Sequence, residues 1–358
     1  MPKATASSRR LLSAIALLIV AGTVAIRLGA DEELEPLFDD EPQLREVKYP
    51  DWFKSSFLDL RADVREAVAT GKRGLIVYFG QAHCAYCEAL FEINFNDPEI
   101  VAYTQEHFDV VPIDIGGKQI VITPTGKVMT EEVLALEEQT NFTPTVLFYD
   151  SDGDEVFRLR GYYPPFTFRA ALEYVADRHY HSERFRDYLA RGEAAMIFEG
   201  ELADQDFVSP APYALDRTRF PAEQPLLVLF EQGDCHGCNV LHAHIFSDPV
   251  IRQRLESFEI VQLDMWADTP VLTPEGRHTS ARDWAADLEL FYAPSLVFFD
   301  ERGQEIMRID SVVRLYRLTR VLDYLISGAY KEHPHFPRWH HRDAYRATPW
   351  RLTTPSAP

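Results

Sequence analysis

Apolar residues recur along this chain with the two spacings that distinguish helices from strands. From Phe57 to Ala67 they return about every three or four positions, as one buried face of a helix requires, and Gly71 ends that helix. The next apolar run, Gly74 to Gly80, is short, continuous and rich in β-branched and aromatic side chains. Such a run is typical of a central strand that is covered on both faces. The pattern therefore predicts a helix that leads into a buried strand.

The same order of elements occurs a second time. Aligning Cys84 with Cys235 gives matching residues at an offset of 151, and after one deletion at an offset of 150. An accidental run of matches in the same order is very improbable, so the pattern indicates a duplicated domain. The matched positions of the first copy include Phe79, Gln81, Phe95, Asp97, Pro98, Phe108, Asp114, Pro144, Phe148, Asp150, Gly153, Arg158 and Tyr180.

Each copy predicts an α/β unit with a mixed sheet. The order is a strand, a Cys-x-x-Cys at a helix start, a helix after Asp-Pro, a strand, an inserted loop, a helix, a hairpin and a final helix. The first strands of the two predicted hairpins cover residues 145–150 and 295–300, and the turns that follow them cover residues 151–153 and 301–303. In the second copy, four prolines between residues 210 and 225 replace the first amphipathic helix. We expect that segment to be largely irregular.

The length of 358 residues is consistent with two domains, at ~150 residues for each. The acidic stretch that precedes the first repeat contains prolines and little periodic apolar content, which is typical of a tether. The predicted divisions are a signal or anchor at 1–30, an acidic linker at 31–50, a first domain at 51–191, a linker at 192–209, a second domain at 210–345 and a tail at 346–358.

The N-terminus has the pattern of an export signal. Arg9 and Arg10 precede an uncharged, mostly apolar run over residues 11–26. Its 16 residues are fewer than the ~20 that normally span a bilayer, which favours cleavage. An uncleaved anchor in the inner membrane is the alternative. Either outcome places the folded part outside the cytoplasm, which in a bacterial cell is the periplasm, where disulfides form and persist.

The charge balance excludes one class of partner. The chain has 36 Lys and Arg against 56 Asp and Glu, a formal net charge of −20. Such a charge repels polyanions at long range, so we expect no nucleic acid partner. The surplus of carboxylates indicates a solvated acidic surface.

All four cysteines lie in two short motifs, QAHCAYC and QGDCHGC. A strand followed by Cys-x-x-Cys at a helix start, with a residue-Pro step leading into a hairpin, resembles the thioredoxin superfamily. The resemblance covers about 51–191 and 210–342, and implies two tandem thioredoxin-like domains, each a mixed central sheet flanked by helices. The arrangement is also similar to exported bacterial thiol:disulfide oxidoreductases of the SoxW type.

The resemblance implies the roles of the cysteines and of two prolines. At a helix start, unpaired backbone N–H groups and the helix dipole stabilise a thiolate, so Cys84 and Cys235 are the predicted nucleophiles. Cys87 and Cys238 are the predicted resolving thiols. The superfamily also places a cis-proline against the cystine, where the preceding residue pairs with substrate. The matching positions are Thr143 with Pro144, and Ala293 with Pro294.

The residues around the cysteines depart from the family pattern. His83 and Asp234 replace the familiar tryptophan, and Ala85-Tyr86 and His236-Gly237 replace the usual Gly-Pro. A cationic His236 would favour the Cys235 thiolate, while Asp234 would oppose it. We therefore regard His83, Tyr86, Asp234 and His236 as modulating residues and leave the direction of electron flow open. Cytosolic thioredoxins carry a buried acid on the strand before the motif, and the corresponding residues here are Tyr78 and Leu229, which are not acidic.

Other uses of the cysteines fit less well. The pairs are too far apart for a usual zinc site, and Glu88 and Asn239 stand where covalent haem needs histidine. A dithiol that handles Cu(I) or another soft metal is the alternative function. The histidines at 333, 335, 340 and 341 invite a metal site, but the matching segment 180–188 favours aromatic packing of each segment on its own domain.

The sequence thus predicts an exported thiol:disulfide oxidoreductase with two dithiol sites and no bound cofactor or metal. Its expected partners are redox proteins or small thiol and disulfide substrates. The inserted loops at 115–130 and 265–279 are candidates for partner choice. Because the residues between the cysteines differ, the two sites are expected to have different potentials, so that electrons could pass from one to the other or each domain could serve its own partner.

Overall fold

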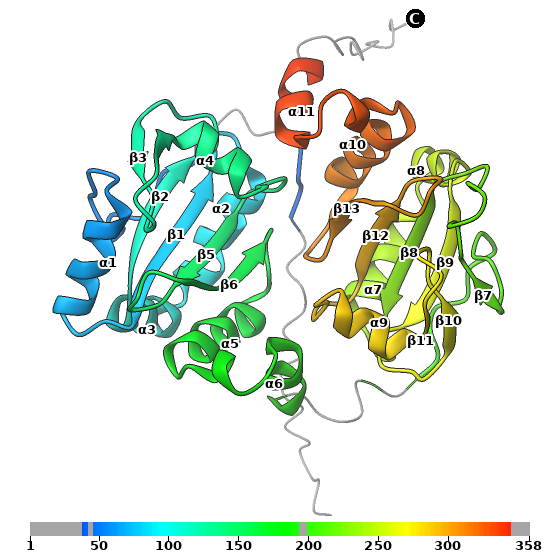
Figure 1. Cartoon of the computed structure of the whole chain (residues 1–358), viewed down its shortest axis with the longest axis horizontal. Coiled ribbons are helices and arrows are strands. Elements are labelled where there is room, and N and C mark those ends of the chain that lie inside the picture. Colours follow the sequence, from blue (N-terminus) through cyan, green and yellow to red (C-terminus); the bar gives the residue numbers. More distant parts are fainter. Residues whose placement is uncertain (1–37, 42–45, 193–197, 199, 345–358) are drawn as a thin grey trace, which may run out of the picture. The chain divides into compact units, whose positions relative to one another are not determined.

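The computed structural model describes residues 38–41, 46–192, 198 and 200–344 (Figure 1). The predicted signal or anchor at 11–26 and the tail at 346–358 lie outside these ranges, so neither prediction is tested. Among the helices of the described ranges, none is both long and apolar enough to cross a bilayer.

The first repeat is built on a four-stranded mixed sheet in the order β2-β1-β5-β6. The central strand β1 (Gly74–Gly80) pairs parallel with β2 (Phe108–Asp114) and antiparallel with β5 (Thr145–Tyr149). The edge strand β6 (Glu155–Arg160) closes the predicted hairpin with β5. Every residue of β1 is buried, as its continuous apolar run predicts for a strand covered on both faces.

Helices cover both faces of this sheet. Because side chains alternate along a strand, Ile76 and Tyr78 of β1 join one core cluster, while Leu75, Val77 and Phe79 join another. The inserted loop forms a small hairpin, β3 (Ile120–Ile122) with β4 (Val128–Thr130). The helices are α1 (Leu60–Ala69), α2 (Ala85–Glu92), α3 (Pro98–His107), α4 (Glu131–Glu137), α5 (Pro165–Ala176) and α6 (Phe185–Gly192), with 3-10 turns at Asn94–Asn96 and His179–His181.

The start of α1 differs from the sequence prediction. The helix begins at Leu60 because Leu58 has a positive φ of 62° and the Asp59 side chain caps the first turn, accepting a hydrogen bond from the Ala62 N–H. Phe57 is therefore outside the helix and exposed, so its assignment to the buried face was wrong. Leu60, Val64 and the rest of the predicted face are buried.

The second repeat has the same sheet, in the order β13-β12-β8-β9. Its strands are β8 (Leu226–Glu231), β9 (Glu259–Asp264), β12 (Ser295–Phe299) and β13 (Glu305–Ile309), and β12 and β13 form the second predicted hairpin. The helices are α7 (His236–Val240), which continues as a π-helical turn over Leu241–Ile245, α8 (Pro249–Leu255), α9 (Ala281–Asp287), α10 (Leu315–Ile326) and α11 (Phe336–Ala344), with a 3-10 turn at Ala329–Lys331.

The proline-rich segment before β8 is irregular, as predicted. Its described residues contain no α-helix, and the short strand β7 (Tyr213–Ala214) pairs with β10 (Pro270–Leu272), which pairs with β11 (His278–Ser280). The fold class is thus confirmed: two mixed sheets, each flanked by helices, occur in tandem.

Equivalent segments of the two repeats contact each other. Phe142, in the loop before Pro144, joins the core of the second repeat, with its ring centroid 5.7 Å from that of Phe336. Phe291 packs on the first repeat in the same manner, 4.9 Å from Phe185. The Val312 N–H also donates to the Tyr162 carbonyl. The C-terminal aromatic residues were expected to pack on their own domains, but Phe185 and Phe336 contact the other repeat as well.

Candidate active sites

The first cysteine pair lies at the junction of β1 and α2. Cys84 and Cys87 form a disulfide with a Cα–Cα distance of 5.2 Å. Cys84 is the N-cap of α2, and its Sγ accepts a hydrogen bond from the Cys87 N–H at 3.0 Å. The sulfur therefore lies where backbone donors and the helix dipole would stabilise a thiolate after reduction.

The second pair repeats this geometry after β8. Cys235 and Cys238 are joined by a disulfide with the same Cα–Cα distance of 5.2 Å. Cys235 is the N-cap of α7, and its Sγ accepts the Cys238 N–H at 3.0 Å. All four cysteines are buried in this oxidised state. The catalytic roles assigned to them from sequence remain predictions, but the two local geometries are equivalent.

Both predicted proline positions lie beside the cystines. The peptide bonds Thr143–Pro144 and Ala293–Pro294 are cis. The Thr143 Oγ1 is 3.2 Å from the Cys84 Sγ, and the Ala293 carbonyl oxygen is 3.6 Å from the Cys235 Sγ. A further cis bond, Ala211–Pro212, lies in the irregular segment and was not anticipated.

The predicted modulating residues occupy different surroundings. His83 and Asp234 are exposed, and His236 is half-buried. Tyr86 is buried, and burial raises the pKa of its hydroxyl well above the ordinary value. That hydroxyl donates to the Asp40 Oδ2 at 2.8 Å and accepts the Arg314 N–H at 2.9 Å. Tyr86 is thus tied to both the tether and the second repeat.

Asp40 links the acidic segment before the first repeat, the predicted tether, to α10. Its carboxylate accepts the backbone N–H groups of Tyr316 and Arg317, at 2.9 and 2.7 Å, in the first turn of the helix. Arg314, the N-cap residue of α10, makes no side-chain capping bond, so Asp40 acts as a capping carboxylate supplied from elsewhere in the chain.

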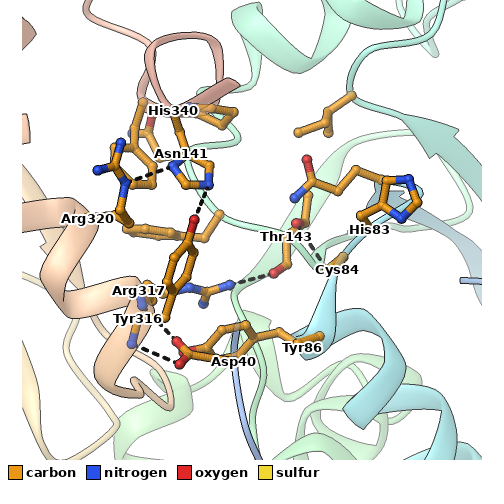
Figure 2. A pocket seen from close by; sticks show the side chains of 16 residues that line it. Asp40, His83, Cys84, Tyr86, Asn141, Thr143, Tyr316, Arg317, Arg320 and His340 are labelled. Atoms are coloured by element: carbon orange, nitrogen blue, oxygen red, sulfur yellow. Dashed lines mark hydrogen bonds between the residues drawn. The ribbon is translucent and has the colours of Figure 1, made fainter. Parts of the chain in front are cut away.

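Arg317 of α10 covers the first site. Its guanidinium lies 3.3 Å from the Tyr86 ring centroid, and its Nη2 donates to the Thr143 carbonyl at 2.9 Å (Figure 2). Burial lowers the pKa of this guanidinium. Together these residues border a cavity of about 80 Å³ beside Cys84. Sequence reasoning missed Asp40 and Arg317; the available signal was an arginine one turn before Val321 on the buried face of α10.

A buried polar cluster lies near the second site. Glu231, the last residue of β8, is fully buried, and its carboxylate oxygens are 2.8 and 3.0 Å from the His242 Nε2. The Gln262 amide donates to the same carboxylate at 2.7 Å. The sequence comparison considered Leu229 and missed Glu231 two residues later, although an acid in an apolar strand was a usable signal. The matching position in the first repeat is Gly80.

Two of the C-terminal histidines, His335 and His340, lie among packing contacts, whereas the side chain of His341 is outside the described part of the structure. Burial lowers the pKa of His335 to about 4. The His340 ring stacks on Phe336, and its Nε2 is 3.4 Å from the Tyr316 hydroxyl. Within the described ranges, no group of three or more His, Cys, Asp or Glu could hold a metal ion.

Comparison with protein families identifies the fold family. A family profile described as a thioredoxin-like domain matches residues 60–176 and 217–326, which together make up more than half of the chain. The chain belongs to the thioredoxin-like family. The comparison with curated protein sequences finds no match. Nothing in these matches bears on the narrower SoxW-type resemblance, which stays a prediction.

Solved structures similar to parts of the chain include a thioredoxin-fold protein from Helicobacter pylori, 26% identical, covering 33% of this chain and 78% of that one, with a TM-score of 0.30. A thioredoxin from Thermus thermophilus is 25% identical and covers 33% of this chain and 83% of its own, with a TM-score of 0.27. The oxidised C-terminal domain of Neisseria meningitidis DsbD is 21% identical, with coverages of 32% and 90% and a TM-score of 0.24.

Proposed function

We propose that this thioredoxin-like protein is a thiol:disulfide oxidoreductase with two redox-active dithiol sites, which exchanges electrons with redox proteins or small sulfur-containing molecules. The observation that carries the proposal is the repeated geometry of the cystines. Each nucleophile position is a helix N-cap, its sulfur accepts a backbone N–H, and a cis-proline segment lies beside it.

The chemistry follows from this geometry. In the reduced protein, the Cys84 thiolate attacks one sulfur of a partner disulfide, and the partner's other sulfur leaves as a thiolate. The Cys87 thiolate then attacks the Cys84 sulfur and releases the second partner thiolate, which restores the internal disulfide. The protein loses two electrons and two protons, and the partner gains them. Cys235 and Cys238 act in the same order, and both sites can run in reverse.

The surroundings of the two sites support unequal redox potentials. At the first site, the Arg317 cation lies over Tyr86 and contacts the segment before Pro144. At the second, Glu231 and His242 form a buried pair four residues before the first cysteine and four after the second. Because a nearby cation stabilises a thiolate, and the second motif is instead flanked in sequence by a carboxylate–imidazole pair, we infer different thiol stabilities. Electron transfer between the sites is part of this proposal.

Trapping variants test the function. Replacing Cys87 or Cys238 by Ala in the full chain removes the resolving thiol of one site, so mixed disulfides should accumulate on Cys84 or Cys235. Mass spectrometry of the trapped adducts identifies partners and assigns them to a site. The matched controls replace both cysteines of that site. No adduct on either cysteine, together with tight binding of Cu(I) by the reduced protein, would instead favour soft-metal handling.

We further propose that the protein acts in the periplasm, exported or tethered by residues 11–26. The support is the arginine pair followed by an apolar run, together with four cysteines that all form disulfides. Fractionation of cells that produce the full chain tests the location. Deleting residues 11–26 should leave the protein in the cytoplasm with reduced cysteines, whereas unchanged localisation would contradict the proposal.

A further inference from the structure

The first cystine lies beside a cavity that contains a buried cation. We propose that this site takes a low-molecular-weight disulfide or thiol whose substituent carries a carboxylate or a similar anion, held by Arg317, and that it excludes polypeptide disulfides. This inference rests on the proposed thiol:disulfide exchange and specifies the substrate class of one of its two sites.

The cover over the first site argues against a polypeptide substrate. The carbonyl of Thr143, where the family pairs with extended substrates, already accepts a hydrogen bond from the Arg317 Nη2. Thr143, Cys84 and Tyr86 are all buried. A strand-like segment would have to displace Arg317 and separate Tyr86 from Asp40. The cost includes a buried cation and a buried carboxylate that lose partners.

Among the described residues, the second site has no counterpart of the Arg317–Tyr86 cover. Tyr86 is replaced by Gly237, and both Gly237 and His236 are half-buried rather than buried. Ala293, the counterpart of Thr143, is also half-buried, and the position that matches Arg317 in the first repeat is Thr167. The two sites therefore differ in access although their cystines have the same geometry.

The unsatisfied charge indicates the kind of ligand. Arg317 is only 9% exposed, and its Nη1 has no hydrogen-bond partner among the described residues. The nearest carboxylate, that of Asp40, is used by the Tyr86 hydroxyl and two backbone N–H groups. Among the described residues, the Asp40 carboxylate attracts the Arg317 guanidinium but makes no ion pair with it. A buried, incompletely paired cation is unfavourable, and a bound anion would offset that cost.

The cavity fits a small substituent. Its volume is about 80 Å³, and Arg320 and His340 line it together with Arg317 and Cys84 (Figure 2). Because one water needs ~10–15 Å³ of accessible space, the cavity holds on the order of five to eight heavy atoms. That is the size of a thiol with a short acidic chain. A planar guanidinium suits a carboxylate, since it can donate two parallel hydrogen bonds.

The reaction balances for such a substrate. For a disulfide RSSR, the Cys84 thiolate forms a bond to one substrate sulfur while RS⁻ leaves, and the Cys87 thiolate then releases the second RS⁻. The substrate takes two electrons and two protons from the Cys84–Cys87 dithiol and becomes two RSH. In the reverse direction two RSH reduce the cystine.

The test compares three short-chain disulfides of different charge: dithiodipropionate, hydroxyethyl disulfide and cystamine. Each is mixed with the reduced full chain that retains only the first site, Cys235→Ser with Cys238→Ser, and with the chain that retains only the second, Cys84→Ser with Cys87→Ser. Rates of dithiol oxidation are read by acid quenching, alkylation and mass spectrometry. Comparing the two chains cancels the intrinsic reactivity of each reagent.

We expect the rate with the anionic disulfide, divided by the rate with the neutral one, to be at least about tenfold higher at the first site than at the second. A factor of this size corresponds to one hydrogen bond to a charged group. Arg317→Gln should bring the ratios of the two sites within about threefold, and Arg320→Gln should lower the first-site ratio by a smaller factor. Arg252→Gln, at a partly exposed position of α8 that is not part of the cavity lining, should leave the ratio unchanged. Native insulin, with its disulfides intact, should react faster with the second site.

Each outcome decides something. Equal ratios at the two sites overturn the proposed anion specificity while leaving the oxidoreductase function intact. Equal reactivity of both sites with insulin overturns the exclusion of polypeptides. If neither site reacts with any disulfide, the proposed function itself fails. Circular dichroism of Arg317→Gln shows whether the fold persists, and Arg320→Gln keeps the charge argument testable if it does not.

Discussion

The hydroxyl of Tyr86 holds the first active site against the second repeat, so its removal has a calculable cost. Tyr86→Phe deletes the bond donated to Asp40 and leaves the Arg314 N–H without its acceptor. Both groups are buried in the native protein, and the ring itself still fits. A hydrogen bond to a charged group contributes ~1.5–3 kcal/mol and a neutral one ~1 kcal/mol, so the expected loss is about 2–4 kcal/mol in the free energy of unfolding.

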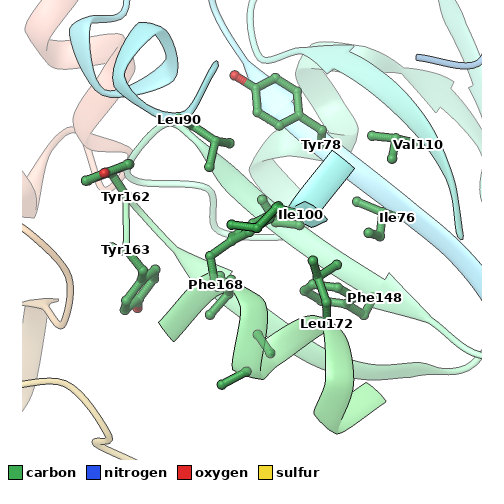
Figure 3. Packing of buried hydrophobic residues seen from close by; sticks show 14 of the residues in the cluster. Ile76, Tyr78, Leu90, Ile100, Val110, Phe148, Tyr162, Tyr163, Phe168 and Leu172 are labelled. Atoms are coloured by element: carbon green, nitrogen blue, oxygen red, sulfur yellow. The ribbon is translucent and has the colours of Figure 1, made fainter. Parts of the chain in front are cut away.

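Urea denaturation measures this loss, with circular dichroism and tryptophan fluorescence compared to establish whether the repeats unfold together. The matched control is Tyr78→Phe. Tyr78 is equally buried, among the apolar side chains of the same core cluster (Figure 3), but its hydroxyl has no hydrogen-bond partner in the described part of the chain. Its removal should be neutral or slightly stabilising.

A double-mutant cycle of Tyr86→Phe with Asp40→Ala isolates the pairwise contact, and we expect a coupling energy of about 1–3 kcal/mol. A loss below about 0.5 kcal/mol for Tyr86→Phe, equal to that of Tyr78→Phe, would refute the reasoning, because deleting buried, satisfied hydrogen bonds cannot be so small in effect. The contact between the tether, α10 and the first active site would then not exist in solution.

Three further predictions concern stability. The folded-state pKa of His335, about 4, is below its ordinary value of 6.5, so the stability that the neutral imidazole contributes is fully present above pH 6.5 and declines as the pH falls toward 4. After discounting for partial exposure, we expect the free energy of unfolding to fall by about 1–2 kcal/mol over this range, and this pH dependence should be absent in His335→Gln. Glu231→Leu should cost about 1–3 kcal/mol or more by leaving the His242 Nε2 and the Gln262 amide without their buried hydrogen-bond partner, with partial recovery when His242→Leu is added. Gly161 has a φ of 108° and lies against a side chain of the second repeat, whereas Gly71 has a φ of 87° and lies in open space. Thermal unfolding should therefore show a larger loss of stability for Gly161→Ala than for Gly71→Ala, and an equal loss would contradict the packing.

The local parts of this fold were predictable from sequence because their signals are local. The apolar run of β1 and the turn residues of the β5–β6 hairpin specify strands within a few residues. The position of Cys84 at the start of a helix follows from the same short-range pattern. The repeat then carried these assignments to the second half of the chain.

The features that distinguish the two sites depend on contacts between distant segments. Asp40 belongs to an acidic stretch without periodicity, and Arg317 is one of several arginines near α10, so nothing in their neighbours along the chain indicates that they meet Tyr86. Helix α1 begins only at Leu60 because Leu58 has a positive φ, and the spacing of apolar residues does not reveal such a backbone conformation. Glu231 could have been found, since an acid ending an apolar strand requires a buried partner.

A redox titration of the full-length chain tests the central claim most directly. The protein is equilibrated in two graded series of buffers, reduced with oxidised dithiothreitol and reduced with oxidised glutathione, so that both reducing and oxidising potentials are covered. Samples are quenched with acid and alkylated, and the free thiols of each pair are counted by peptide mass spectrometry. We predict two reversible two-electron transitions, one for Cys84 with Cys87 and one for Cys235 with Cys238, each lost only when its own pair is replaced by Ser. A pair that stays fully oxidised or fully reduced across the series, or oxidises irreversibly, would contradict the assignment of two redox-active sites.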